Sequence, residues 1–213
     1  MLAGIRYLAG NQVVLMSFVV DLIAMIFGMP RALFPQMAHE SFGGPVEGGT
    51  TMALLAAAMS AGAVAGGLFS GWLPRIRRQG LAVVIAIVVW GVAMAGFGVA
   101  SGQAHGTAGT MLWIALAFLA FGGAADMVSA AFRSTILQQA ASDELRGRLQ
   151  GVFVVVVAGG PRLADTAHGV AAAAVGTSVA AAGGGVLVVI GVVIALLAVP
   201  TFVRYRVTGA DRP

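Results

Sequence analysis

The chain has 213 residues, of which 59% are hydrophobic and only 9% are charged. Soluble domains carry about 25% charged residues, so an ordinary soluble globular domain is excluded, and the high hydrophobicity excludes disorder. The sequence has no cysteine, which excludes a disulfide scaffold. We therefore expect most of the chain to lie in a lipid bilayer. At roughly 20 apolar residues per spanning helix, its length has room for about six spans.

Six apolar segments predict an all-α integral membrane protein with six transmembrane helices. Clusters of glycine, proline, serine and aspartate separate the segments, as expected of turns. The segments are too long and too uniformly apolar for the strands of a membrane β-barrel. They cover about 12–35, 50–73, 81–100, 111–134, 149–173 and 177–200. We expect one domain over residues 1–213, with a cytoplasmic tail at 201–213.

The positions of the arginines predict the orientation of the six spans. All basic residues are arginine, and nine of them fall on one side of a six-span alternation, whereas the opposite loops contain none. The nine are Arg6, Arg75, Arg77, Arg78, Arg146, Arg148, Arg204, Arg206 and Arg212. Because basic residues favour the cytoplasmic side, both termini are predicted to be cytoplasmic. The arginines lie in short clusters between apolar runs, so no nucleic-acid-binding face is expected.

Seven ionisable residues lie inside the apolar segments or at their edges: Asp21, Arg31, Asp126, Arg133, Arg162, Asp165 and His168. Each charged residue costs about 2.5–3.5 kcal/mol at the centre of a spanning helix, so each should face a partner or a water-filled cavity. Asp21 and Asp126 are deep and have no cation one turn away. They are predicted to line a cavity or to make an interhelical hydrogen bond, and either could carry a proton.

The other ionisable residues allow simpler interpretations. Arg162, Asp165 and His168 are spaced by three residues, which suggests one polar stripe, and Pro161 should kink or open that helix. The alternative is that Asp165 only neutralises Arg162. Arg133, near the cytoplasmic end, is expected to extend to the lipid headgroups or to cap a loop. His168, near the outer end, is expected to lie at the wet interface.

Sequence motifs for enzymes and metal sites are missing. There is no cysteine, and the three histidines are far apart, so neither a metal site nor another cofactor is indicated. A phosphate-binding loop of the G-x-x-x-x-G-K-[ST] type needs a lysine, and the chain has none. No G-x-S-x-G nucleophile elbow is present. We therefore do not expect an enzyme.

The loop between the second and third segments resembles the cytoplasmic loop motif of the major facilitator superfamily, roughly G-x-L-x-D-R-x-G-R-R. Gly71, Leu73, Arg75 and Arg78 match that motif, whereas Pro74 and Arg77 replace its Asp and its second Gly. The lost Asp removes any gating ion pair built on it. Residues 143–151 also look like the loop between the tenth and eleventh helices of many of these transporters.

Three further stretches are similar to the enterobactin-exporter-like branch of this superfamily: 21–35, 123–138 and 159–165. The resemblance covers essentially the whole chain and corresponds to helices seven to twelve of a twelve-helix fold. It implies a half bundle with a 3+3 inverted repeat. It also implies a substrate path lined by the first, second, fourth and fifth segments. The residues predicted for the path or for proton coupling are Asp21, Arg31, Asp126, Arg133, Arg162 and Asp165.

The resemblance implies a proton-coupled exporter of a small organic molecule, siderophore-like or drug-like, in the inner membrane of a bacterial cell. The bundle would alternate against a second six-helix half or a second copy of the chain, with Asp21 or Asp126 carrying the proton. Arg31 and Arg162 suit an anionic catecholate. The rival hypothesis is a truncated or non-transporting membrane half that needs a separately encoded first half or a homodimer. The expected partners are therefore the lipid bilayer, protons, the substrate and that second bundle.

Overall fold

The structure is a computed structural model. It describes residues 11–140 and 143–205, without the side chains at 140, 143–146, 148–150, 152, 153 and 157. Of the described residues, 86% are helical and none lies in a strand. The all-α prediction is therefore confirmed. Arg6, Arg206 and Arg212, and the side chains of Arg146 and Arg148, lie outside the part that is described.

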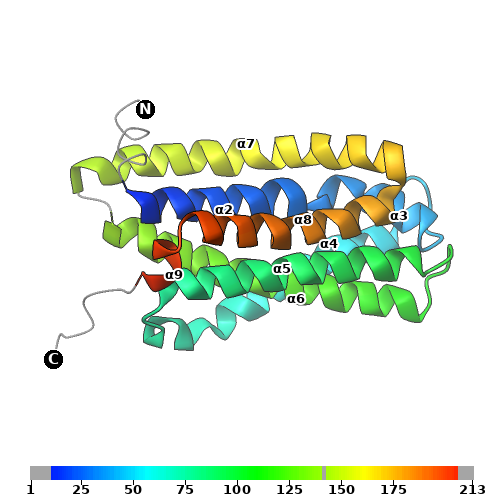
Figure 1. Ribbon diagram of the computed structural model, residues 1–213. Helices are drawn as coiled ribbons and strands as arrows, with labels where there is room; N and C mark the ends of the chain where they lie inside the picture. Colours follow the sequence, from blue (N-terminus) through cyan, green and yellow to red (C-terminus); the bar gives the residue numbers. More distant parts are fainter. Residues whose placement is uncertain (1–10, 141–142, 206–213) are drawn as a thin grey trace.

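The described part of the chain has six long helices, and they run side by side along one axis (Figure 1). Short helices cap or interrupt them at both ends of the bundle. In chain order the elements are α2 (Gln12–Gly28), η1 (Pro30–Leu33), α3 (Phe34–Glu40), α4 (Thr50–Leu68), η2 (Ser70–Arg75), α5 (Gln79–Gly102), α6 (Thr110–Ala140), α7 (Asp143–Val175), α8 (Thr177–Ala198) and α9 (Thr201–Arg204).

Five of the helical stretches are long and apolar enough to cross a bilayer: α2 with its extension to Glu40, α4, α5, α6 up to Gln139, and α8. The chain is thus an all-α protein with the character of a membrane protein. The sixth long helix, α7, has 33 residues but is not among these five. It has enough length to cross, but it carries charged and polar side chains along its middle.

The helices begin and end at different residues from the predicted segments. The first helix stops at Gly28 because Pro30 cannot continue it, and the chain resumes as η1 and α3 up to Glu40. The second stops at Leu68, and Pro74 lies in the 3-10 turn η2 that follows. In contrast, α6 and α7 extend beyond the predicted segments, to Ala140 and back to Asp143. Apolar residues mark the part of a helix suited to hydrocarbon, whereas hydrogen bonding and capping set where it ends.

α5 lies at the centre of the bundle and packs along both α6 and α8, while α4 packs on the other side of α6. The close approach of α4 and α6 depends on glycine: a side chain at Gly62 would collide with the backbone of Ala120, and one at Gly123 with that of Met59. α7 is peripheral. It packs mainly on α2, η1 and α8, and contacts α6 only slightly.

The two ends of the bundle differ in charge. The start of α2, the turn η2, the start of α5 and the helix α9 lie at one end, where Arg75, Arg77, Arg78 and Arg204 are exposed (Figure 1). At the opposite end the connections 41–49, 103–109 and Gly176 contain no arginine or lysine. Gly106 donates a backbone hydrogen bond to the Ser41 carbonyl (2.9 Å), and the Ser41 hydroxyl lies 3.3 Å from that of Ser178. These bonds hold the arginine-free connections together.

Candidate functional site: a charged cavity between α2 and α6

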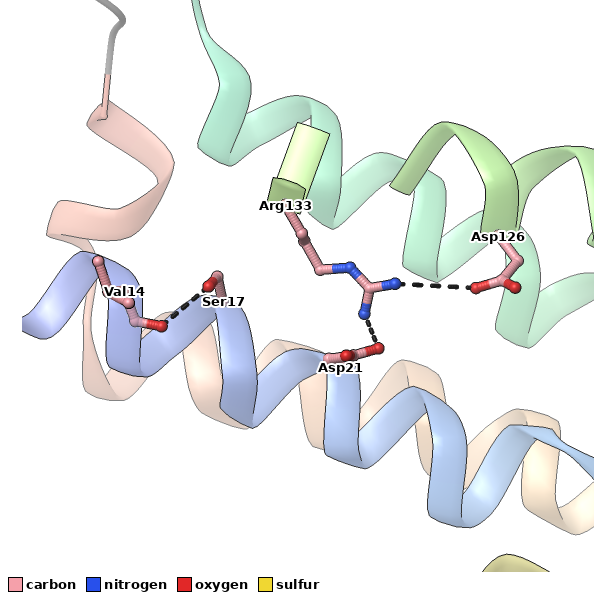
Figure 2. A network of polar contacts seen from close by, with 5 residues as sticks. All are labelled: Val14, Ser17, Asp21, Asp126 and Arg133. Atoms are coloured by element: carbon pink, nitrogen blue, oxygen red, sulfur yellow. Dashed lines mark hydrogen bonds and ion pairs between the residues drawn. The ribbon is translucent and has the colours of Figure 1, made fainter. Parts of the chain in front are cut away.

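Two of the predicted path residues, Asp21 and Asp126, converge on a third, Arg133. Figure 2 shows Asp21 on α2 and Asp126 on α6 pointing toward the two ends of its guanidinium group. Nη1 of Arg133 forms an ion pair with Oδ1 of Asp21, and Nη2 lies 3.9 Å from Oδ1 of Asp126. Among the described side chains these are the only ion pairs recorded. Arg133 thus joins two helices that have little other contact.

The helical spacing explains why α6 presents both of its charged residues to the same place. Asp126 and Arg133 are seven residues apart, which is close to two full turns, so they lie on one face of α6. Ser129 lies between them on that face, and its hydroxyl is buried without a hydrogen-bond partner. On α2, the nearby Ser17 hydroxyl donates to the Val14 carbonyl (2.8 Å) (Figure 2). Its proton is therefore not available to Asp21, whose partner is Arg133.

The two carboxylates are held very differently. The side chain of Asp21 is 8% exposed and that of Arg133 is 10% exposed, whereas the side chain of Asp126 is 43% exposed. A buried charge is tolerated only when it is paired, so Asp21 and Arg133 depend on each other. Asp126 is at the long limit of an ion pair and is only partly buried. The prediction that Arg133 extends to the headgroups is therefore wrong, because depth along the helix does not tell which way the side chain turns.

A cavity of about 350 Å³ lies against this ion-pair network. Four of the six predicted path residues line it, namely Asp21, Arg31, Asp126 and Arg133. The other lining residues are Ala24, Met25, Met29, Trp90, Ala130 and Pro161. The cavity therefore combines two acids and two bases with apolar and thioether surfaces, a composition that suits an organic molecule with a polar group.

Arg31 is the cation of the cavity that makes no ion pair in the described part of the chain, although it lies close enough to Asp126 to attract it electrostatically. It lies in η1, directly after Pro30 ends α2, so the break in the helix turns its exposed side chain toward the cavity. Its Nε lies 3.3 Å from the sulfur of Met59 on α4, which is a weak acceptor. Most of the N–H donors of its guanidinium group therefore remain available to a molecule that enters the cavity.

Arg162 and Asp165 do not join the site. Both are exposed, and no ion pair joins them among the described residues. The buried face of α7 is instead formed by Gly160, Ala164, His168 and Ala172, which recur every four residues. A spacing of three residues drifts about 60° per step around an α-helix, so Arg162, Asp165 and His168 do not form one stripe. His168 is only 4% exposed, and its prediction as a residue of the wet interface is wrong.

Two prolines inside the predicted segments behave differently. Pro30 ends α2 within the first predicted segment. Pro161 lies inside α7, which continues unbroken from Asp143 to Val175, so the predicted opening of that helix is wrong. A proline inside a helix removes one backbone hydrogen bond and crowds the carbonyl four residues earlier, which can bend a helix without ending it. Pro161 nevertheless lines the cavity, where it supplies an apolar wall.

The loop motif that carries the superfamily resemblance lies away from the cavity. Gly71, Leu73 and Arg75 belong to η2, and Arg78 is the residue directly before α5. Arg75 and Arg78 are exposed, and nothing lies within 4 Å of a side chain built at Gly71. Trp72 holds the turn against α6 through an edge-to-face contact with Phe132, with ring centroids 6.5 Å apart.

Sequence reasoning missed several residues of the site. Trp90 reaches the cavity from α5, and it approaches α2 closely because Gly28 has no side chain. Met25, Met29 and Ser129 were not singled out either. The spacing of Ser129, three residues after Asp126 and four before Arg133, was a usable signal, whereas the apolar lining residues look like any others in the sequence.

No protein family, curated protein or solved structure matches this chain. By its structure, the described part of the chain is an all-α, apolar bundle with five helices long and apolar enough to cross a bilayer. Its candidate site is the charged cavity between α2 and α6.

Proposed function

We propose that the chain is a six-helix, major-facilitator-type half of a transporter that exports a small organic molecule in exchange for protons. The observation that carries this proposal is the unequal sharing of Arg133 by Asp21 and Asp126 beside the cavity. Ionisable residues inside a membrane bundle are costly and usually mark the path of a substrate or a proton. The resemblance in the sequence points the same way.

The proposal needs α7 to be a sixth span, and the course of the chain supports this. α7 runs beside the other long helices for its whole length (Figure 1). α9 follows α8 and packs next to the starts of α2 and α5. The last long helix therefore ends on the side where the first one begins, as an even number of crossings requires. The exposed arginines at that end make it the cytoplasmic side under the positive-inside rule.

Within this proposal Asp126, rather than Asp21, carries the proton. Protonating Asp21 would leave the buried Arg133 without its close partner. Asp126 is more exposed and already loosely held, so it can gain or lose a proton while the Asp21–Arg133 pair persists. A proton on Asp126 also changes the net charge of the cavity, and therefore its preference for the substrate.

Arg31 favours a substrate with an anionic or acidic group. Its guanidinium faces the cavity and makes no ion pair among the described residues, with Asp126 as a more distant neighbour, and Arg pairs well with anionic oxygens. The methionine, alanine and tryptophan surfaces would contact an aromatic or aliphatic body. Arg162 no longer supports this preference, since it does not line the cavity.

A second bundle is part of the proposal. Arg162, Asp165 and Thr166 are exposed on the middle part of α7, where contact with lipid would be costly. A facing six-helix half, or a second copy of this chain, would cover this surface and close the cavity. The rival hypothesis of an inert half has the same surface but predicts no transport.

Transport by the reconstituted chain tests the proposal. Vesicles containing the purified protein are given an acidic lumen and supplied with 2,3-dihydroxybenzoylserine or, for comparison, ethidium. We expect faster uptake of the catecholate than into protein-free vesicles, abolished by a protonophore. If neither compound crosses faster than through protein-free vesicles, the chain alone is not a transporter of this kind and the inert half is favoured.

The role of Asp126 is tested with matched variants. Asp126→Asn should abolish accumulation driven by the pH gradient while leaving exchange of labelled for unlabelled catecholate. Asp165→Asn makes the same chemical change outside the cavity and should behave as wild type. Equal gradient-driven accumulation by Asp126→Asn and wild type would remove the proton role from this residue.

A further inference from the structure

A second pocket lies on the other side of the α2–α7 contact, away from Arg133. It has a volume of about 320 Å³ and is formed by α8, α7 and the end of α2. Ile26, Ala171, Val175, Val179 and Leu187 contribute to its walls. We name it the His168 groove, because His168 is its only lining residue with a polar side chain.

Glycine on α8 makes the groove possible. A side chain at Gly184 would collide with the Phe27 carbonyl and would lie 2.8 Å from Cε1 of His168. Gly183, the residue before Gly184, also lines the groove, but nothing lies within 4 Å of a side chain built at Gly183. α8 therefore approaches α2 and α7 at Gly184 and leaves an open channel beside Gly183.

His168 has one nitrogen left for a ligand. The imidazole is 4% exposed, and its Nε2 is buried with no hydrogen-bond partner among the described residues. The backbone of Phe27 lies close to the ring. In an uncharged imidazole one nitrogen is a donor and the other an acceptor, so Nε2 is an acceptor when Nδ1 carries the proton. A buried acceptor without a partner costs about 1–3 kcal/mol in a protein.

The surroundings favour the uncharged imidazole. The other residues that line the groove have no ionisable side chain. Asp165, one turn earlier on α7, is exposed, and no ion pair with His168 is recorded in the described part of the chain. A buried charge without a partner is far more costly than a buried neutral group.

We propose that the His168 groove binds a lipid-soluble alcohol or phenol, whose hydroxyl donates to Nε2 of His168 and whose apolar body fills the channel beside Gly183. Apolar residues on the rim, including Val175, Val179 and Leu187, are exposed and would face the acyl chains of the bilayer. The occupant therefore enters from the membrane. This site is separate from the charged cavity and does not depend on transport.

The test compares 4-octylphenol with 4-octylanisole, its methyl ether, which lacks the hydroxyl donor. Both are titrated into the purified protein in lipid nanodiscs, with empty nanodiscs as the baseline, and the ¹⁵N resonances of the histidine rings are followed. We expect the phenol, but not the ether, to shift the Nε2 resonance of His168. The phenol should bind about tenfold more tightly, as expected for one net hydrogen bond.

Three variants separate a ligand site from a packing defect. His168→Leu should give the phenol and the ether equal affinity, and Gly183→Leu should abolish binding of both by filling the channel. Gly169→Leu places the same side chain on α7 at a position that does not line the groove and that has nothing within 4 Å, and it should bind as wild type. Equal binding of the two compounds by the wild-type protein, or a Gly183→Leu variant that still binds the phenol, would overturn the proposal.

Discussion

α6 and α7 each carry an acid and an arginine in their middle parts, but they use them in opposite ways. On α6, Asp126 and Arg133 point into the bundle, and Arg133 is buried against Asp21 of α2. On α7, Arg162 and Asp165 point outward and no ion pair is recorded for them in the described part of the chain. The difference shows that the direction of a charged side chain around its helix decides its role more than its depth does.

Removing the buried arginine should have the largest effect on stability. Arg133→Met leaves Asp21 buried without its cation, and breaking a buried ion pair by removing one partner costs about 3–5 kcal/mol. The free energy of unfolding is measured in mixed detergent micelles. Arg162→Met, the same change on the exposed face of α7, should stay within about 0.5 kcal/mol of wild type. Equal losses in the two variants would remove the distinction between the helices.

Much of the helical architecture could be predicted from the sequence, because apolar segments of this length have few alternatives in lipid. Each of the six predicted segments corresponds to a long helix, although their ends shift by several residues. The sequence also shows which residues are ionisable and how far each lies from the ends of its apolar segment. Four of the six proposed path residues line one cavity, and their role in a path stays a prediction.

The directions of the side chains were harder to predict. The seven-residue spacing of Asp126 and Arg133 indicated a shared face, but a judgement from depth alone put Arg133 among the lipid headgroups. On α7 the four-residue repeat of Gly160, Ala164, His168 and Ala172 indicated the buried face. The spacing of the ionisable residues predicted a different stripe. Packing of small residues against α2 and α8 determines how α7 is rotated, and that needs the neighbouring helices to be known.

A double-mutant cycle should sharpen the same comparison. If Asp21 and Arg133 stabilise each other, combining Asp21→Leu with Arg133→Met should cost less than the sum of the single changes. The difference should be about 1–3 kcal/mol, as found for directly interacting residues. The corresponding cycle with Arg162→Met and Asp165→Leu should be additive within about 0.5 kcal/mol. Additivity at Asp21 and Arg133 would mean that each is stabilised by something else.

Glycine substitutions compare the packing of the two helices without changing any charge. Gly123→Ala on α6 puts a methyl group into the backbone of Met59 on α4 and should destabilise the protein by about 1–3 kcal/mol. Gly159→Ala on α7 meets nothing within 4 Å and should be neutral or stabilising by up to about 1 kcal/mol, because alanine favours helix. A loss of self-association in Gly159→Ala, with unfolding unchanged, would indicate that a second copy covers this part of α7.

The smallest effect is expected at Ser129, whose buried hydroxyl lies on the charged face of α6 without a partner. Ser129→Ala removes a polar group that gains nothing from its surroundings, so it should stabilise the protein by up to about 1 kcal/mol. Thr166→Ala is the control on α7, since that hydroxyl already donates to the Arg162 carbonyl (3.0 Å) and is exposed. A destabilising Ser129→Ala would mean that the hydroxyl holds a water against Asp126 or Arg133. The inner face of α6 would then be hydrated like the outer face of α7. The two helices would differ in whether their charged side chains form ion pairs, and not in whether water reaches them.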